Sequence, residues 1–412
     1  MISSLFYRHI NAMTDLMISN VNLGPELRFH EPVQSSLRLS VIVPAKDEAE
    51  FITSTLDALR LQCDESGNPI SYDTYEVLVL ANNCSDDTYE ICRKYQGRHP
   101  RFRMYVQQMV IPSEIAHIGT VRRLLMDAAQ HRLVGVAGAR GIIVSTDADS
   151  EVDPYWVHHI ILEMDKGVDV VGGRILPRET PALSRKHHLR DVTYRFLRSQ
   201  LEAELDPCTD NPWPRHFQCY GPSLAVTCEM YERAGKLPMI PYLEDEEFRK
   251  ALKRVDARIR HSPKVRIYTS SRLQGRVGFG FSVQLQQWSD MSLNQEQQSV
   301  ESLEAVTFQL GLKNSLRQLW AAVKEGRQVI MDIRTVAFKI HFDTEELLML
   351  MSQSSYFEPV WELIYDKVVK DRPALLTAQP IADAIREFRH YFAFRDNAEV
   401  PAILEAQTLL AV

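Results

Sequence analysis

Short apolar runs alternate with amphipathic segments along the first third of the chain. Each apolar run is continuous and ends at a proline, an amide or an acid, which is the pattern of strands buried on both faces of a sheet. The amphipathic segments repeat their apolar residues every three or four positions, the spacing of one helix face. The strand-like runs are residues 39–45, 75–83, 101–108 and a run from 142, and the helix-like segments are 51–62, 85–96 and 118–130.

Strands that alternate with helices in units of about 30 residues predict an α/β fold with a doubly wound, mainly parallel sheet. Towards the C-terminus the pattern changes to long helical runs, such as 302–326 and 357–371. We therefore predict an N-terminal helical or extended arm at 1–37, an α/β domain at 38–291 and a mostly helical C-terminal region at 292–412. We expect the C-terminal helices to pack on the α/β domain or to form the interface of a homodimer.

Composition and charge exclude several classes of protein. The formal net charge of −7 argues against a nucleic-acid partner, because binding to phosphates needs a local excess of Lys and Arg. No segment approaches the roughly 18 to 20 uncharged apolar residues of a membrane span. The six cysteines form no C-x-x-C pair, which predicts free thiols in a reducing compartment. We expect a cytoplasmic protein without a membrane span.

Polar clusters follow three of the predicted strands at the point where each strand ends: KDE at 46–48, NN at 82–83 and DAD at 147–149. Ligands of doubly wound sheets bind outside the carboxyl ends of the strands. Two acids one residue apart repel each other unless a cation joins them, and Mg²⁺ or Mn²⁺ prefers carboxylate oxygens and bridges to substrate phosphates. Neither G-x-G-x-x-G nor G-x-x-x-x-G-K-[ST] follows the first strand, which disfavours dinucleotide oxidoreductases and P-loop phosphotransferases.

Five segments resemble, in the expected order, the motifs of the family-2 glycosyltransferases with the GT-A fold. They lie within residues 38–290 and read VIVPAKDEAE, NNCSDDT, TDADS, YGPSLAVTCEMYERAGKLP and YLEDEEFRKALKR. The resemblance implies a GT-A catalytic domain, a nucleotide-diphosphate sugar as co-substrate and a divalent cation, Mn²⁺ or Mg²⁺, as cofactor.

The first two motifs line the nucleotide in this family. The resemblance places Pro44, Asp47 and Glu48 along the nucleotide, with Glu48 accepting a hydrogen bond from the ribose or the base. Asn82 and Asn83 stand where many relatives have an acid that accepts from the uracil N–H. An amide oxygen can also accept that bond, so the identity of the base stays open.

Two further residues belong to the implied nucleotide site. Asp87 matches the acid that follows the serine of the second loop, and it fits a helix-capping role equally well. Arg122 takes the place of an arginine that relatives carry on the helix before the metal strand. For the neighbouring Arg123 the alternative to a place in the nucleotide site is a side chain that faces solvent.

The third and fifth motifs imply the metal ligands and the base. Asp149 is implied as the direct metal ligand, with Asp147 nearer the ribose and a metal-bound water. His261 is the nearest candidate for the histidine that completes the metal sphere in some relatives, although a lone histidine is more often structural. Asp245 is the implied catalytic base, because transfer to a hydroxyl needs a carboxylate within reach of the attacking oxygen, and Glu244 is the alternative.

The segment 269–281 combines three glycines with Arg272 and Arg276. This composition predicts a mobile loop whose arginines meet the diphosphate as it leaves. The run QLQQW at 284–288 resembles the Q-x-x-R-W motif of processive polysaccharide synthases, with Gln in place of Arg. Because we predict no membrane span that could export a polymer, we expect a non-processive enzyme.

Together these features predict a metal-dependent hexosyltransferase that moves a sugar from a nucleotide-diphosphate sugar, preferably a UDP-sugar, to a small sugar, sugar-acid or other hydroxyl acceptor. A carboxylate base implies inversion, and a retaining GT-A transferase of the sugar-acid synthase type is the alternative. A sugar-1-phosphate nucleotidyltransferase shares the doubly wound fold, but its Gly-rich L-x-x-G-x-G-x-R turn is absent. The non-enzyme alternative is a degenerate sugar-binding relative, against which the intact acidic motifs speak.

Overall fold

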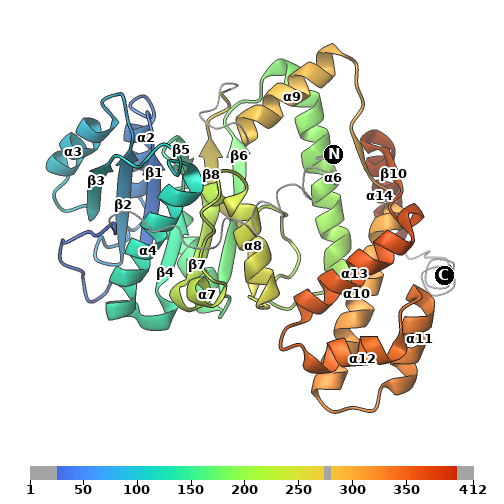
Figure 1. Ribbon diagram of the computed structural model, residues 1–412. Coiled ribbons are helices and arrows are strands. Elements are labelled where there is room, and N and C mark those ends of the chain that lie inside the picture. The colour runs from blue at the N-terminus through green and yellow to red at the C-terminus, as the bar shows by residue number, and fades with distance from the viewer. Residues whose placement is uncertain (1–25, 273–279, 397–412) are drawn as a thin grey trace.

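The computed structural model describes residues 26–272 and 280–396, and residues 1–25, 273–279 and 397–412 lie outside the description. Its centre is an eight-stranded sheet with the strand order β3-β2-β1-β4-β7-β6-β8-β5 (Figure 1). The strands are β1 (Leu39–Ala45), β2 (Tyr75–Asn82), β3 (Met104–Met109), β4 (Ile142–Ser145), β5 (Ser150–Val152), β6 (Val170–Pro177), β7 (Leu224–Thr227) and β8 (Ile259–Thr269).

The sheet is mainly parallel, as the alternating pattern predicts. Strands β3, β2, β1 and β4 pair in parallel, and β6 and β8 form a second parallel pair. Strand β7 runs antiparallel between β4 and β6, and β5 runs antiparallel along β8. The carboxyl ends of β1, β2 and β4 therefore meet at one edge of the sheet, where the polar clusters of the sequence follow them.

Helices cover both faces of the sheet because alternate strand residues point to opposite sides. Val41 and Val43 of β1 pack in one buried cluster with α2, α3 and α5, whereas Ile42 packs in another with α4, α7 and α8. The first three helices are α2 (Ile52–Arg60), α3 (Thr88–Arg98) and α5 (Trp156–Asp165), and the others are α4 (Ile118–Ala137), α7 (Cys228–Arg233) and α8 (Glu244–Arg254).

The long helix α6 (Ala182–Leu205) runs beside the sheet towards a helical region formed by the end of the chain (Figure 1). Two apolar clusters hold this region together. One cluster contains residues of α10, α11, α12 and α13, and the other contains residues of α6, α10 and α14. A two-stranded sheet of β9 (Ser299–Glu301) and β10 (Ala378–Pro380) ties its two ends. Its helices are α9 (Phe281–Leu293), α10 (Leu303–Lys324), α11 (Ile330–Ile340), α12 (Thr344–Gln353), α13 (Phe357–Asp371) and α14 (Ile381–Asp396).

All six cysteines are free thiols. In the part of the chain that the structure describes, no helix combines the length and the apolar character needed to cross a bilayer.

Candidate active site

A cavity of about 1390 Å³ opens at the carboxyl ends of β1, β2 and β4 and extends between α6, α8, α10 and α13. It brings together residues that lie more than 300 positions apart in the sequence, from Pro44 to Glu358. The predicted site residues that line it are Pro44, Glu48, Asn82, Arg122, Asp147, Asp149, Glu244, Asp245, His261 and Arg272.

Two predicted nucleotide residues instead shape the loops behind the strand ends. Asp47 and Asn83 have left-handed backbone conformations, with φ of 53° and 46°. The Asp47 carboxylate accepts from the N–H of Ser85 at 2.6 Å and from its hydroxyl at 3.0 Å. The Asn83 amide donates to the carbonyl of Ile111 at 2.8 Å and accepts from its N–H at 3.0 Å. Both side chains therefore hold the loops in place.

Asp87 is exposed at the start of α3, and its side chain makes no capping hydrogen bond. Its neighbour Asp86 fills that role by accepting from the N–H of Thr88 at 3.0 Å, and it also accepts from the N–H of Ala49 at 3.0 Å. The side-chain hydrogen bond at the start of α3 is therefore made by Asp86, the residue before the predicted Asp87.

Among the described residues, Asp47, Cys84 and Asp86 form the group of three whose potential metal-ligand atoms lie within 4.8 Å of one another. Both of its carboxylates already accept backbone N–H bonds, and burial raises the pKa of the Cys84 thiol. We therefore interpret this group as loop structure.

Arg122, buried on α4, joins two of the predicted motifs. Its Nη2 donates to Asp147 Oδ1 at 2.6 Å, and its Nη1 pairs with the carboxylate of Glu244. The guanidinium lies against the backbone of Gly221, where a Cβ atom would collide with it. A glycine at this position is needed for Arg122 to reach both acids.

The acids around Arg122 repel one another. Burial raises the pKa of Asp147 to about 6, the charges of Asp149 and Asp245 add to the rise, and Arg122 opposes it. Burial likewise raises the pKa of Glu244 to about 7, with Arg122 again opposing and Asp245 adding. The single buried guanidinium does not compensate this group of carboxylates.

Asp245 lies in the first turn of α8, where a carboxylate is favoured by the helix dipole. Its Oδ2 accepts from the N–H of Gly221 at 2.8 Å, and its Oδ1 accepts from the N–H of Glu246 at 2.8 Å. The carboxylate is therefore held in a fixed orientation and remains partly exposed at the cavity wall. Glu244 differs because it is buried against Arg122.

Arg272 bridges the two other acids of the strand ends. Its guanidinium bonds both oxygens of Glu48, at 2.8 and 3.2 Å, and lies 3.1 Å from Asp149 Oδ2. Arg276, its predicted companion, lies outside the described residues.

This end of the cavity carries an excess of carboxylates. Five acids face the guanidiniums of Arg122 and Arg272 and the exposed ammonium of Lys46. Hard oxygen ligands in negative excess suit a divalent cation, so the residues present fit the implied metal. The five acids are Glu48, Asp147, Asp149, Glu244 and Asp245.

His261 lies on β8 at the other end of the cavity. Its ring nitrogen is 3.0 Å from the Asn211 amide, and its ring meets that of His216 edge-on at 5.8 Å. Burial lowers its pKa well below the usual value, and the neighbouring His216 and Lys253 lower it further. In the described structure it does not form a close three-ligand group with Asp147 and Asp149.

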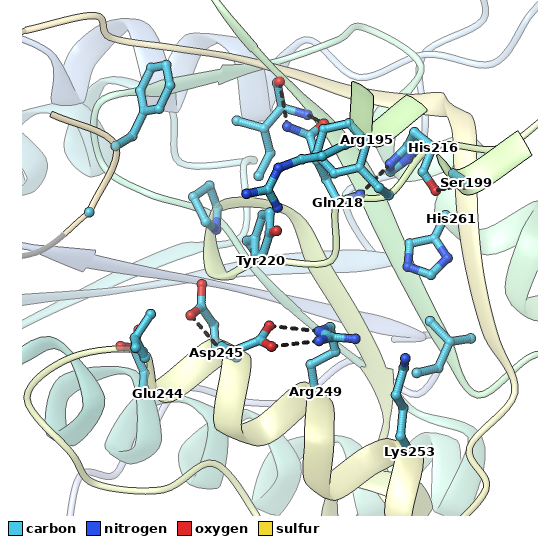
Figure 2. A pocket seen from close by; sticks show the side chains of 18 of the residues that line it. Arg195, Ser199, His216, Gln218, Tyr220, Glu244, Asp245, Arg249, Lys253 and His261 are labelled. Carbon is cyan, nitrogen blue, oxygen red and sulfur yellow. Dashed lines mark hydrogen bonds and ion pairs between the residues drawn. The ribbon is translucent and has the colours of Figure 1, made fainter. Parts of the chain in front are cut away.

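The cavity beyond Asp245 has residues that the sequence reading did not identify. Figure 2 shows Asp245, Arg249 and Lys253 following one another along α8, with Arg195 and Tyr220 on the opposite side. The spacing of four residues along an amphipathic helix was a signal for this row, because residues four apart share one helix face.

Solved structures of sugar transferases resemble this chain at low identity. They include S. aureus TarS 1-349 in complex with UDP-GlcNAc, with 16% identity, a TM-score of 0.42 and coverage of 83% of this chain and 82% of that chain. The mannosyltransferase PcManGT from Pyrobaculum calidifontis, in complex with GDP-Man and Mn²⁺, has 16% identity, a TM-score of 0.38 and coverage of 95% and 91%. GalNAc-T7 with UDP, GalNAc and Mn²⁺ has 13% identity, a TM-score of 0.41 and coverage of 90% and 67%.

Among curated proteins the chain has no match. Residues 40–213 match the family model described as glycosyl transferase family 2. This stretch contains the three motifs at the strand ends, and the mainly parallel sheet with its C-terminal helices agrees with the GT-A fold. Residues 40–213 of the chain therefore form a region that matches glycosyl transferase family 2.

Proposed function

We propose that the chain transfers a hexosyl group from a nucleotide-diphosphate sugar, preferably a UDP-sugar, to a hydroxyl group of a small acceptor in one non-processive, inverting step. The observation that carries this proposal is the arrangement around Arg122. The buried guanidinium joins Asp147, at the end of β4, to Glu244, at the start of α8. The neighbouring Asp149 and Asp245 thereby face the same cavity.

The donor would bind at the carboxyl ends of β1, β2 and β4, within the proposed catalytic domain of residues 38–291. Asn82 is buried at the cavity wall and can accept from the N–H of a base, and Glu48 can accept from a ribose hydroxyl. Asp149, with Asp147 beside it, would hold a divalent cation. That cation, when bound, neutralises the diphosphate and stabilises its charge as it leaves.

Asp245 would act on the acceptor. Its backbone hydrogen bonds fix the carboxylate in place, so it can take the proton of the attacking hydroxyl without first reorienting. Glu244 serves this role less well because its carboxylate is held by the buried Arg122. A base on the acceptor side corresponds to direct displacement and inversion, and the anomeric configuration of the product tests the retaining alternative.

A titration of nucleotide diphosphates tests the donor site and its metal. UDP, or failing that GDP, should bind at least tenfold more tightly with Mn²⁺ than with chelator, because a diphosphate alone is repelled by the strand-end acids. Asp149→Ala should abolish this difference. Glu151→Ala, at an acid that pairs with Arg178 instead of lining the cavity, is the matched control and should keep it. Equal affinity with and without metal in the unaltered protein would overturn the metal assignment.

A further inference from the structure

One face of α8 connects the proposed base to the far end of the cavity. Asp245, Arg249 and Lys253 are spaced by four residues, share a helix face and all line the cavity (Figure 2). At a rise of about 1.5 Å per residue, roughly 12 Å of helix separate Asp245 from Lys253. An acceptor whose hydroxyl lies at Asp245 can therefore place a second group near Lys253.

The cations in this half of the cavity are almost all matched by acids. Each of five cations has a carboxylate within 3.0 Å. These pairs are Arg195–Asp191 at 2.9 Å, Arg215–Glu202 at 3.0 Å, Arg249–Glu246 at 2.6 Å, Lys313–Glu358 at 2.7 Å and Arg317–Asp206 at 2.8 Å.

Lys253 differs from these five cations. Within residues 26–272 and 280–396, its ammonium has neither an ion pair nor a hydrogen bond. The acids that act on it electrostatically include Glu202, Glu358 and Glu246. Each of these already pairs with another cation, which is Arg215, Lys313 or Arg249 respectively. Burial, together with the charges of Arg249 and Lys313, lowers the pKa of Lys253 to about 8. Among these six cations, Lys253 is the one without a close acidic partner in the described structure.

We propose that this part of the cavity is an acceptor subsite for an anionic group, a phosphate or a carboxylate carried by the sugar acceptor, with Lys253 as its counter-ion. The proposal rests on the proposed function, because it assigns the charge of that reaction's acceptor. The attacked hydroxyl lies at Asp245 and the anion at Lys253, with a sugar ring between them. Lys253 here is a binding residue that takes no part in the chemistry.

A structural role for Lys253 makes a different prediction. If the lysine served to neutralise Glu202 and Glu358, its removal would lower the melting temperature. If Lys253 binds an anionic ligand, its charge is uncompensated in the free protein, and burying an unpaired charge destabilises the fold. Replacing it by an apolar side chain of similar length then removes this destabilisation. Lys253→Met should then raise the melting temperature of the unliganded protein while weakening acceptor binding.

Two titrations test the proposal separately from the function on which it rests. The first measures UDP or GDP binding with Mn²⁺, and its failure would count against the donor site alone. The second adds glucose 6-phosphate, glucuronate or glucose to the protein saturated with that nucleotide, or to the free protein if neither nucleotide binds. We expect at least one of the two anionic sugars to bind at least tenfold more tightly than glucose, and the arm that does so identifies the anion as phosphate or carboxylate.

The variants attribute this preference to one side chain. Lys253→Met should remove the preference and leave nucleotide affinity unchanged, and Lys253→Arg should retain it. Lys250→Met is the matched control, because Lys250 lies on the same helix, pairs with Glu247 and does not line the cavity. Equal binding of charged and neutral sugars, binding of none of them at millimolar concentration, or an unchanged preference in Lys253→Met would each overturn the subsite.

Discussion

Asp245 and Glu244 are adjacent in sequence, but their surroundings separate their roles. Glu244 pairs with a buried guanidinium, whereas the hydrogen bonds of Asp245 within the described residues come from backbone N–H groups and its side chain stays partly exposed at the cavity. The sequence reading kept both as candidates for the base, since neighbouring positions on a helix N-terminus cannot be told apart by motif. The position of Arg122, which comes from a different helix, makes the distinction.

Asp245→Asn should therefore lower kcat by roughly 10² to 10⁴, because the amide keeps the shape of the side chain but cannot take a proton. Nucleotide affinity should stay within about twofold, since the proposed donor site lies at the strand ends. Steady-state kinetics and a nucleotide titration measure the two effects. Glu247→Gln, on the same helix turn but outside the cavity wall, is the control that should retain turnover. Wild-type turnover in Asp245→Asn would remove this residue from the mechanism.

Local sequence patterns predicted the strands and the polar clusters at their ends. They did not predict which of these polar side chains form hydrogen bonds within the loops. Strands β1, β2 and β4 follow from continuous apolar runs, and the acids after them follow from the chain order of the motifs. Asp47 and Asn83 fit the same motifs, yet their side chains bond Ser85 and Ile111. Such bonds depend on the left-handed turns at both positions, which a motif does not specify.

At the scale of elements, α8 carries both the proposed base and Arg249 and Lys253 at the far end of the cavity. The run from Glu244 belongs to the fifth motif, but the helices α6, α10 and α13 that line the cavity with it come from regions outside the family motifs. Whether Lys253 has a partner depends on how those helices pack, which periodicity does not show. The acceptor end of the site is therefore the part that sequence reasoning missed.

The titration of Lys253 predicts how anion binding depends on pH. Because its folded-state pKa is lowered to about 8, the ammonium of the free protein loses its proton as pH rises through 8. Affinity for glucose 6-phosphate should fall between about pH 7.5 and 9.5, where the phosphate itself, with a second pKa of roughly 6, stays dianionic. The other titratable or charged groups around Lys253 are Arg249, Glu202, Glu246, Lys313, Glu358, His261 and Cys219.

Most of these neighbours hold one charge state over that range. The pKa of Glu202 and of Glu358 is lowered, that of Cys219 is raised to about 12, and that of His261 is lowered well below its usual value. Lys253→Arg keeps all the neighbours and stays charged, so its affinity should be flat from pH 7.5 to 9.5. A flat profile in the unaltered protein would contradict the assignment of Lys253.

At the scale of the whole molecule, the cavity depends on two separately packed parts. The sheet has its own apolar clusters on each face, and the helical region is held by a cluster of α6, α10 and α14 around Phe388. The Phe388 ring is fully buried and meets the ring of Tyr194 edge-on at 5.7 Å. We therefore expect that the helices at the proposed acceptor end can be loosened without disturbing the proposed donor end.

Phe388→Ala should lower the free energy of unfolding by about 3 to 5 kcal/mol, the usual cost of removing a buried phenylalanine. Nucleotide affinity, measured below the unfolding temperature, should not change, because the donor residues lie on the sheet. Urea unfolding followed by circular dichroism gives the first quantity. Phe394→Ala, at an exposed position of the same helix, should stay within about 0.5 kcal/mol of the unaltered protein. A parallel loss of nucleotide affinity would show that the two parts are coupled.

Arg272 gives the donor end an order of assembly. Its guanidinium already neutralises Glu48 and Asp149, so a divalent cation that arrives alone must displace a cation of the protein. A cation that arrives with a diphosphate brings a new anion for the displaced guanidinium. By linkage, each of the two ligands should then strengthen the binding of the other by the same factor. Without the donor, the enzyme would bind little metal. The donor and the metal would bind together.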